Sequence, residues 1–212
     1  MKPSFRSALA VLWDSFLPNN VVLVQALGFC PILSAGIHLR YGVALSVCTI
    51  VTMVLTNTVF SLFSRFISKR LQPPLYVLLS SAFLLGAMLV LHQFVSAEIY
   101  AHLYLFLPLL AVNTLYTYRA TVSPTAKFSS VLVTAADALG TSLGFSLVLC
   151  IASALREITI NGTLWDLPLG FSARFPEAAH PFIGFILLGF MVAALRWFKQ
   201  LGNRKEEEVG LS

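Results

Sequence analysis

The sequence predicts an all-α membrane protein with six transmembrane helices, arranged as two inverted three-helix repeats. Of its 212 residues, 58% are hydrophobic and only 11% are charged, and the mean hydropathy is +0.84. Soluble domains carry roughly a quarter charged residues, so this composition excludes a soluble enzyme, a disordered tail and a nucleic-acid-binding protein. Six apolar stretches supply the spans, and the uneven distribution of basic residues between them supplies the topology.

A transmembrane helix needs about 20 mainly apolar residues. The expected spans are, in chain order, Val21–Ile37, Gly42–Phe63, Leu75–Val95, Ala101–Tyr116, Val131–Ala154 and Phe182–Phe198. The chain therefore divides into an N-terminal segment (1–20), a six-helix transmembrane domain (21–198) and a tail (199–212). Within the first segment, Ser4–Phe16 is expected to form an amphipathic helix on the cytoplasmic surface, anchored by Trp13.

Lysine and arginine concentrate in cytoplasmic loops. With six spans, 11 of the 14 basic residues fall on the side that holds both termini, and three fall on the other. This distribution predicts a multi-pass protein with both termini in the cytoplasm. The net charge of +5 is mostly this topological signal.

Two expected spans contain helix breakers. Gly28, Cys30 and Pro31 lie within the first span, and Pro108 lies within the fourth. Proline removes a backbone donor and clashes with the preceding turn, so helices 1 and 4 should be broken. Inverted halves with matching broken helices are a transport architecture with its site near mid-membrane. A thiol at such a break is well placed to ligate a metal, whereas a lone cysteine is more often a small buried apolar residue.

The fifth span holds the other notable polar group. Gly140 and Gly144 form a G-x-x-x-G pair that permits close helix packing. Asp137, one turn earlier, is either an ion or proton site or a carboxylate that caps the helix or pairs with Arg119 or Lys127. The cost of an unpaired intramembrane carboxylate favours the second interpretation.

The remaining residues carry no recognisable soluble-enzyme chemistry. Cys48 and Cys150 have no helix breaker beside them and are expected to be packing residues. The sequence shows no phosphate-binding glycine loop, no catalytic-triad spacing and no CxxC pair. Any catalysis is therefore expected to be electron or ion transfer within the bilayer, or to be carried by partner subunits.

Several motifs resemble one family. Residues 19–31, Asn-Asn-Val-Val-Leu-Val-Gln-Ala-Leu-Gly-Phe-Cys-Pro, resemble the opening of the RnfE/NqrD membrane subunits. The chain agrees in order at Pro74-Leu75-Tyr76-Val77, Phe106-Leu107-Pro108-Leu109, Arg119-Ala120, Leu155-Arg156-Glu157-Ile158 and Asn161-Gly162-Thr163-Leu164-Trp165. Leu12-Trp13 and the Gly-Thr-Leu-Trp element point to this branch rather than to the sister subunit, RnfA/NqrE, which has the opposite topology.

The resemblance implies a bacterial inner-membrane subunit that packs against its RnfA-like sister as an inverted pair. Each of the two subunits is thought to supply two cysteines to a 2Fe–2S cluster or iron centre at their interface. Cys30 matches the first cysteine, whereas Thr114 stands where the second is expected. The centre would then use three cysteines and another donor, recruit Cys48 or Cys150, or be altered or lost.

Three functions follow from this. The first is a membrane subunit of an Rnf-type ferredoxin:NAD oxidoreductase, or of the related Na⁺-translocating NADH:quinone reductase. It would pass electrons across the membrane and couple them to Na⁺ or H⁺ translocation within a hetero-oligomer that includes subunits of the B, C, D and G types, and it would have no activity alone. The second is a cluster-free scaffold in the same complex. The third is a small stand-alone transporter.

Overall fold

The computed structural model describes residues 5–16, 29–35, 38–63, 66–68, 70–104, 107–111, 131–165, 167–168 and 180–210. Most of these residues are helical. The helices are α1 (Phe5–Phe16), α3 (Phe29–Ala35), α4 (Leu39–Phe63), α5 (Gln72–Phe94), α6 (Ala97–Leu103), α7 (Leu107–Ala111), α9 (Val131–Asn161) and α10 (Pro181–Gly210). Strands β1 (Thr163–Leu164) and β2 (Leu167–Pro168) form a short antiparallel hairpin.

Three of the described helices are long and apolar enough to cross a membrane. They cover Leu39–Phe63, Gln72–Gln93 and Val133–Asn161, and a shorter apolar stretch covers Phe182–Ala194 in α10. These helices match the expected second, third, fifth and sixth spans. The expected first and fourth spans lie partly outside the described residues and contain only short helices where they are described. The structure is that of a helical membrane protein, and the six-span repeat stays a prediction.

The ends of α5 and α9 follow from local backbone chemistry. Pro73 and Pro74 lie in the first turn of α5, where a missing N–H group removes no helical hydrogen bond. Helix α9 ends before Gly162, whose positive φ of 64° is favourable for glycine and whose N–H group bonds to the Ile158 carbonyl at 3.0 Å. The expected fifth span ends at Ala154, whereas α9 continues to Asn161.

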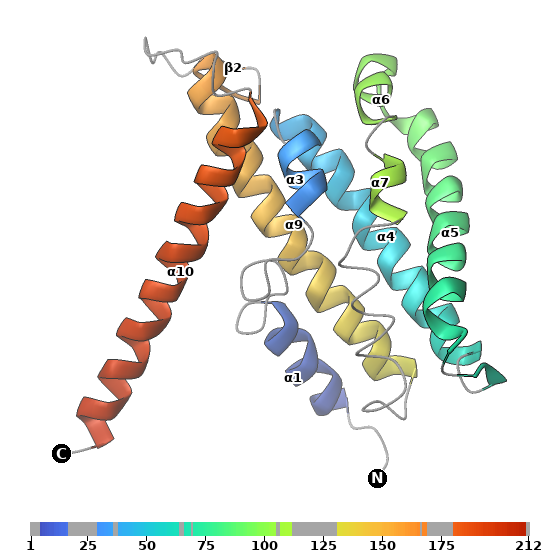
Figure 1. Cartoon of the computed structure of the whole chain (residues 1–212), viewed down its shortest axis with the longest axis horizontal. Coiled ribbons are helices and arrows are strands. Elements are labelled where there is room, and N and C mark those ends of the chain that lie inside the picture. Colours follow the sequence, from blue (N-terminus) through green and yellow to red (C-terminus); the bar gives the residue numbers. More distant parts are fainter. Residues whose placement is uncertain are drawn as a thin grey trace.

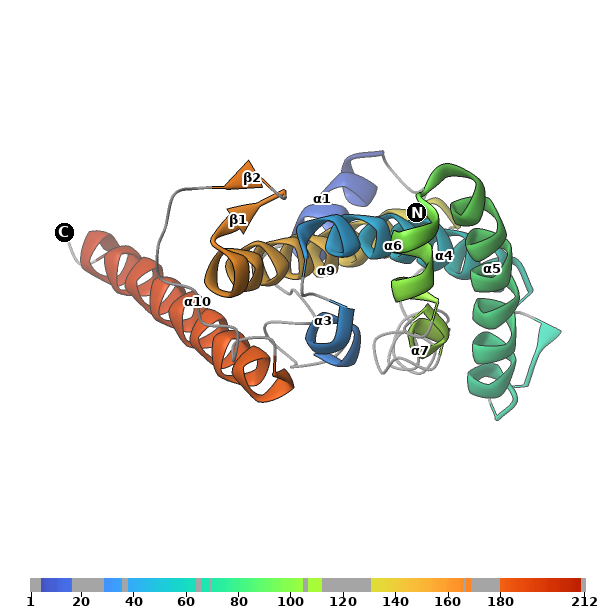
Figure 2. The ribbon, with the colours of Figure 1, turned by 90° about the horizontal axis from the view of Figure 1, so that it is seen from above.

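Helices α4 and α9 form the centre of the molecule and run antiparallel (Figure 1). Helix α5 packs beside α4, and α1 packs along the first part of α9. Figure 2 shows α3 and α7 on one side of the α4–α9 pair and α1 on the other. The end of α10 that contacts α3 and α9 lies near the hairpin, whereas its other end and α1 lie at the opposite end of the molecule.

The outer and inner faces of α9 differ in the way that a lipid environment favours. Leu143, Leu147, Ile151 and Leu155 recur every four residues and are about 40% exposed each. The opposite face carries small and hydroxyl-bearing residues that pack against α4. A Cβ atom on Gly42 of α4 would lie 3.0 Å from the Ser153 Cβ, so the two backbones approach closely.

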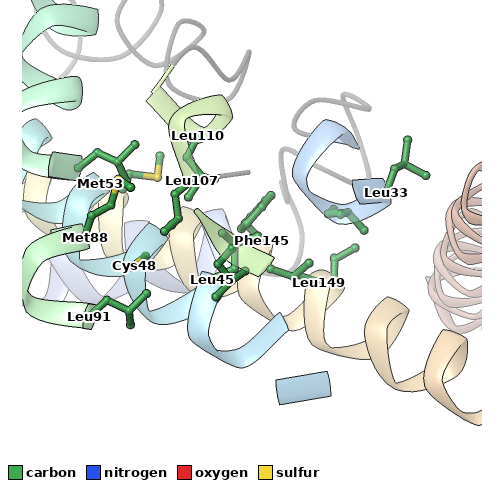
Figure 3. Close-up of a cluster of buried hydrophobic side chains, with 14 of the residues drawn as sticks. Leu33, Leu45, Cys48, Met53, Met88, Leu91, Leu107, Leu110, Phe145 and Leu149 are labelled. Atoms are coloured by element: carbon green, nitrogen blue, oxygen red, sulfur yellow. The ribbon is translucent and has the colours of Figure 1, made fainter. Parts of the chain in front are cut away.

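The buried apolar cluster contains side chains from seven of the described helices, and Figure 3 shows part of it. Leu45 and Met53 of α4 and Phe145 of α9 belong to it, and all three side chains are at most 1% exposed. Side chains from α3, α5, α6, α7 and α10 complete the cluster, including Leu33, Met88 and Leu107. The short helices α3 and α7 are therefore held mainly by packing, because helices of this length are marginal alone.

Candidate functional site

The predicted break in the first span corresponds to the start of α3. This helix begins at Phe29 and carries Pro31 within its first turn, where proline is tolerated. Cys30 is exposed, whereas Pro31, Ile32 and Leu33 are buried. The half-helix α3 therefore packs through one side and presents the Cys30 thiol on its surface. Gly28 lies outside the described residues.

The fourth span is interrupted in a comparable way. Helix α6 ends at Leu103, and α7 begins at Leu107 with Pro108 as its second residue. Leu107 and Leu110 are fully buried in the apolar cluster. Helices α3 and α7 contact each other on the same side of the α4–α9 pair (Figure 2). Each expected break thus coincides with a short helix that has proline in its first turn.

The other two cysteines occupy different surroundings. Cys48 of α4 is 3% exposed and lies among Leu and Met side chains of the apolar cluster (Figure 3). Cys150 of α9 is half-buried, and its sulfur lies 3.6 Å from the Ser46 hydroxyl. These positions agree with the packing roles expected for them.

The described part of this chain would offer one thiolate ligand, Cys30, to the metal centre that the family resemblance implies. Among the described residues, no group of three or more His, Cys, Asp or Glu side chains is arranged to hold a metal. Cys30 offers an accessible thiol, the ligand type that iron–sulfur clusters use. Thr114, expected at the second ligand position, lies outside the described residues.

Asp137 lies at the contact between α9 and α1. It is 4% exposed and accepts a 2.5 Å hydrogen bond from the Ser15 hydroxyl. A Cβ atom on Gly140, one turn along, would collide with the Leu12 backbone. The close approach expected from the glycine motif is therefore confirmed at Gly140, with α1 as the partner. Arg119 and Lys127 lie outside the described residues.

Two buried charged residues were not expected as site residues. Arg156 and Glu157 are each 1% exposed, near the end of α9. Arg156 donates from Nη1 to the Leu33 carbonyl of α3 at 2.7 Å, and Glu157 accepts from the Leu39 N–H of α4 at 2.7 Å. The sequence alone places both in a loop, because charges after an apolar run usually mark a membrane interface. Their burial against α3 and α4 explains why α9 continues past Ala154.

Comparison with known proteins shows which family this chain resembles. Residues 8–199 match the family described as Rnf-Nqr subunit, membrane protein. The chain is 34% identical over 211 residues to a protein of Shewanella loihica that is named as the E-type subunit of an ion-translocating oxidoreductase complex. That match covers 92% of this chain and 90% of the relative.

Two more relatives carry the same name. One is from Glaesserella parasuis, 34% identical with 70% of this chain and 63% of the relative covered. The other is from Haemophilus ducreyi, 33% identical with 74% of this chain and 67% of the relative covered. Because the family match spans most of its length, this chain belongs to the Rnf-Nqr family of membrane subunits.

Proposed function

We propose that this chain is the E-type membrane subunit of an Rnf-type complex in the bacterial inner membrane. Its relatives are named as E-type subunits of an ion-translocating oxidoreductase complex, and three of its helices are long and apolar enough to cross a membrane. In this proposal the complex passes electrons across the membrane and couples their transfer to translocation of Na⁺ or H⁺. The chain has no redox activity by itself.

The observation that carries the proposal is the exposure of Cys30 at the start of α3. Buried small thiols are usually inert, so the exposed thiol of Cys30, next to the buried residues 31–33, is the unusual one of the three. We propose that Cys30 supplies one thiolate ligand to an iron or iron–sulfur centre, such as a 2Fe–2S cluster. Such a centre would supply one-electron transfer. The role of this chain is to hold the Cys30 thiolate at a fixed position.

The remaining ligands would come from an RnfA-like sister subunit that packs against the side carrying α3 and α7. Two short helices on the same side of the α4–α9 pair support this choice of interface (Figure 2). Both termini would face the cytoplasm, in agreement with the location of α1 and the far end of α10 at one end of the molecule (Figure 1). Subunits of the B, C, D and G types would complete the complex.

A second candidate is a cluster-free scaffold in the same complex. One observation favours it: Thr114 stands where the family resemblance places a second cysteine. A neutral hydroxyl is a poor ligand for iron compared with a thiolate. The scaffold would retain the packing of the chain and its partners but hold no metal.

Purification of the complex with and without this chain tests the proposal. We expect the chain to co-purify with its sister subunit and the iron content to exceed that of a complex from which the chain is omitted. The chain produced alone should contain no iron. Co-purification with unchanged iron content would favour the scaffold. Failure to co-purify with any other subunit would reject both candidates.

A further inference from the structure

The connection between α3 and α4 is bound on both sides by two adjacent residues of α9. Leu33 is in the last turn of α3, where carbonyl groups lack helical partners, and Leu39 is the first residue of α4, where N–H groups lack them. Arg156 donates a hydrogen bond to the Leu33 carbonyl oxygen, and Glu157 accepts one from the Leu39 N–H group. Both donor–acceptor distances are 2.7 Å.

The charges have the signs that the two helix ends favour. A helix C-terminus carries a partial negative charge and attracts a cation, and a helix N-terminus attracts an anion. Arg156 meets the C-terminal turn of α3, and Glu157 meets the N-terminus of α4. Both side chains are 1% exposed, and buried charges are costly unless they are well bonded. Their surroundings therefore strongly favour one geometry.

Two further elements close around the pair. A Cβ atom on Gly184 of α10 would lie 2.7 Å from Leu33 Cδ2 and 3.7 Å from the Arg156 guanidinium carbon. Thr163 of β1 donates to the second carboxylate oxygen of Glu157 at 3.3 Å. The pair thus links α3, α4, α10 and the hairpin at one end of the molecule (Figure 1).

The contact at Leu33 is close to Cys30 along the chain. The two residues are three apart in one short helix, so they are separated by about 4.5 Å along its axis. A seven-residue helix has little stability of its own, so its tertiary contacts decide its location.

We propose that Arg156 and Glu157 are a positioning pair, which fixes the half-helix α3 and thereby the location of the Cys30 thiol. The effect of this pair on a metal centre rests on the proposed function. The proposal that the pair fixes the location of α3 concerns this chain alone. Neither residue touches the reacting atoms. The pair acts through the backbone of α3 and α4.

Electron–electron distance measurements between two spin labels test this geometry without any metal. The labels are attached to Cys30 and to Leu89→Cys, on the exposed face of α5, in the full chain with Cys48 and Cys150 replaced by alanine. We expect one narrow distance distribution for this parent. Arg156→Met removes the donor and the charge, and it should at least double the width or shift the maximum.

Two control variants make the result decisive. Arg196→Met, at an exposed arginine of α10, should leave the distribution unchanged. Arg156→Lys retains a donor and a positive charge, so it should restore most of the narrow distribution. A folded Arg156→Met protein with the parent distribution would overturn the proposal, as would a lysine variant as broad as the methionine variant.

If the Arg156→Met protein does not accumulate, substitutions of Glu157 test the proposal independently. Glu157→Gln keeps an acceptor for the Leu39 N–H group and should remain narrow, whereas Glu157→Leu should broaden the distribution. Equal widths in these two variants would overturn the proposal. The iron content of the assembled complex is measured separately. Broadening without any loss of iron would contradict the proposed ligand role of Cys30 and leave the positioning pair intact.

Discussion

Replacing Gly140 by alanine should separate α1 from α9. An added Cβ atom would collide with the Leu12 carbonyl oxygen and lie 3.1 Å from the Leu12 carbonyl carbon and Cα. These are backbone atoms, so no side-chain rotation relieves the overlap. Because carbon atoms pack best at 3.5–4.0 Å, α1 must retreat by roughly 0.5–1 Å. That movement lengthens the 2.5 Å hydrogen bond between Ser15 and Asp137.

The expected cost combines three terms. Overpacking typically costs about 1–3 kcal/mol, and the weakened buried hydrogen bond adds about 1–2 kcal/mol. The higher helix propensity of alanine returns about 1 kcal/mol. The net loss is about 1–4 kcal/mol, which lowers the Tm by about 2–16 °C for a chain of this size.

The assay is thermal unfolding of the purified full-length chain in detergent, followed by circular dichroism. Gly86→Ala is the matched control, because a Cβ atom on Gly86 would meet no atom of the described residues within 4 Å. It should leave the Tm unchanged or raise it slightly. A Gly140→Ala protein as stable as this control would refute the proposed contact.

A double-mutant cycle tests the link to the hydrogen bond. Ser15→Ala alone should cost about 1–2 kcal/mol. In the Gly140→Ala background it should cost less than half as much, because the bond is already weakened. Equal costs in the two backgrounds would show that α1 has not moved.

Three further predictions concern topology and the cysteines. Reporter fusions after Phe63 should report a cytoplasmic location and fusions at Glu98 an outward location, because 11 of the 14 basic residues then lie inside; a cytoplasmic signal at Glu98 would reject the topology. Cys48→Ala and Cys150→Ala should each change the iron content and electron flux of the complex by less than about twofold, since small buried thiols are replaceable; a loss of iron in either would identify a ligand. Thr114→Cys introduces the residue that the family resemblance implies and should leave iron content unchanged or higher, as measured by elemental analysis, whereas a decrease would argue against a ligand position there.

The sequence predicts local features of the fold well. The length of the apolar stretches predicts the spans that correspond to α4, α5 and α9, because a transmembrane helix requires mainly a sufficiently long run of apolar residues. Pro31 and Pro108 predict helix breaks because of the backbone donor that proline lacks, and each lies in the first turn of a short helix. Gly140 predicts a close approach, although nothing in the motif specifies α1 as the partner.

Contacts between segments that are far apart in the sequence could not be predicted from local patterns. Ser15 is 122 residues from Asp137, and Arg156 is 123 residues from Leu33. In a sequence, adjacent opposite charges at the end of an apolar run are typical of the membrane–water interface. Only the packing of α3 and α4 shows that Arg156 and Glu157 are buried. For the candidate site, the sequence identifies Cys30 as the distinctive cysteine but does not identify the other ligands of the proposed centre.

The central claim is that Cys30 supplies a ligand to a metal centre of the complex. Its most direct test is the iron content and low-temperature electron paramagnetic resonance spectrum of the purified complex carrying Cys30→Ser. We predict that the complex assembles with all its subunits, that its iron content falls by the amount of one centre, and that electron flux stops. An assembled Cys30→Ser complex with wild-type iron, an unchanged spectrum and wild-type flux would contradict the claim.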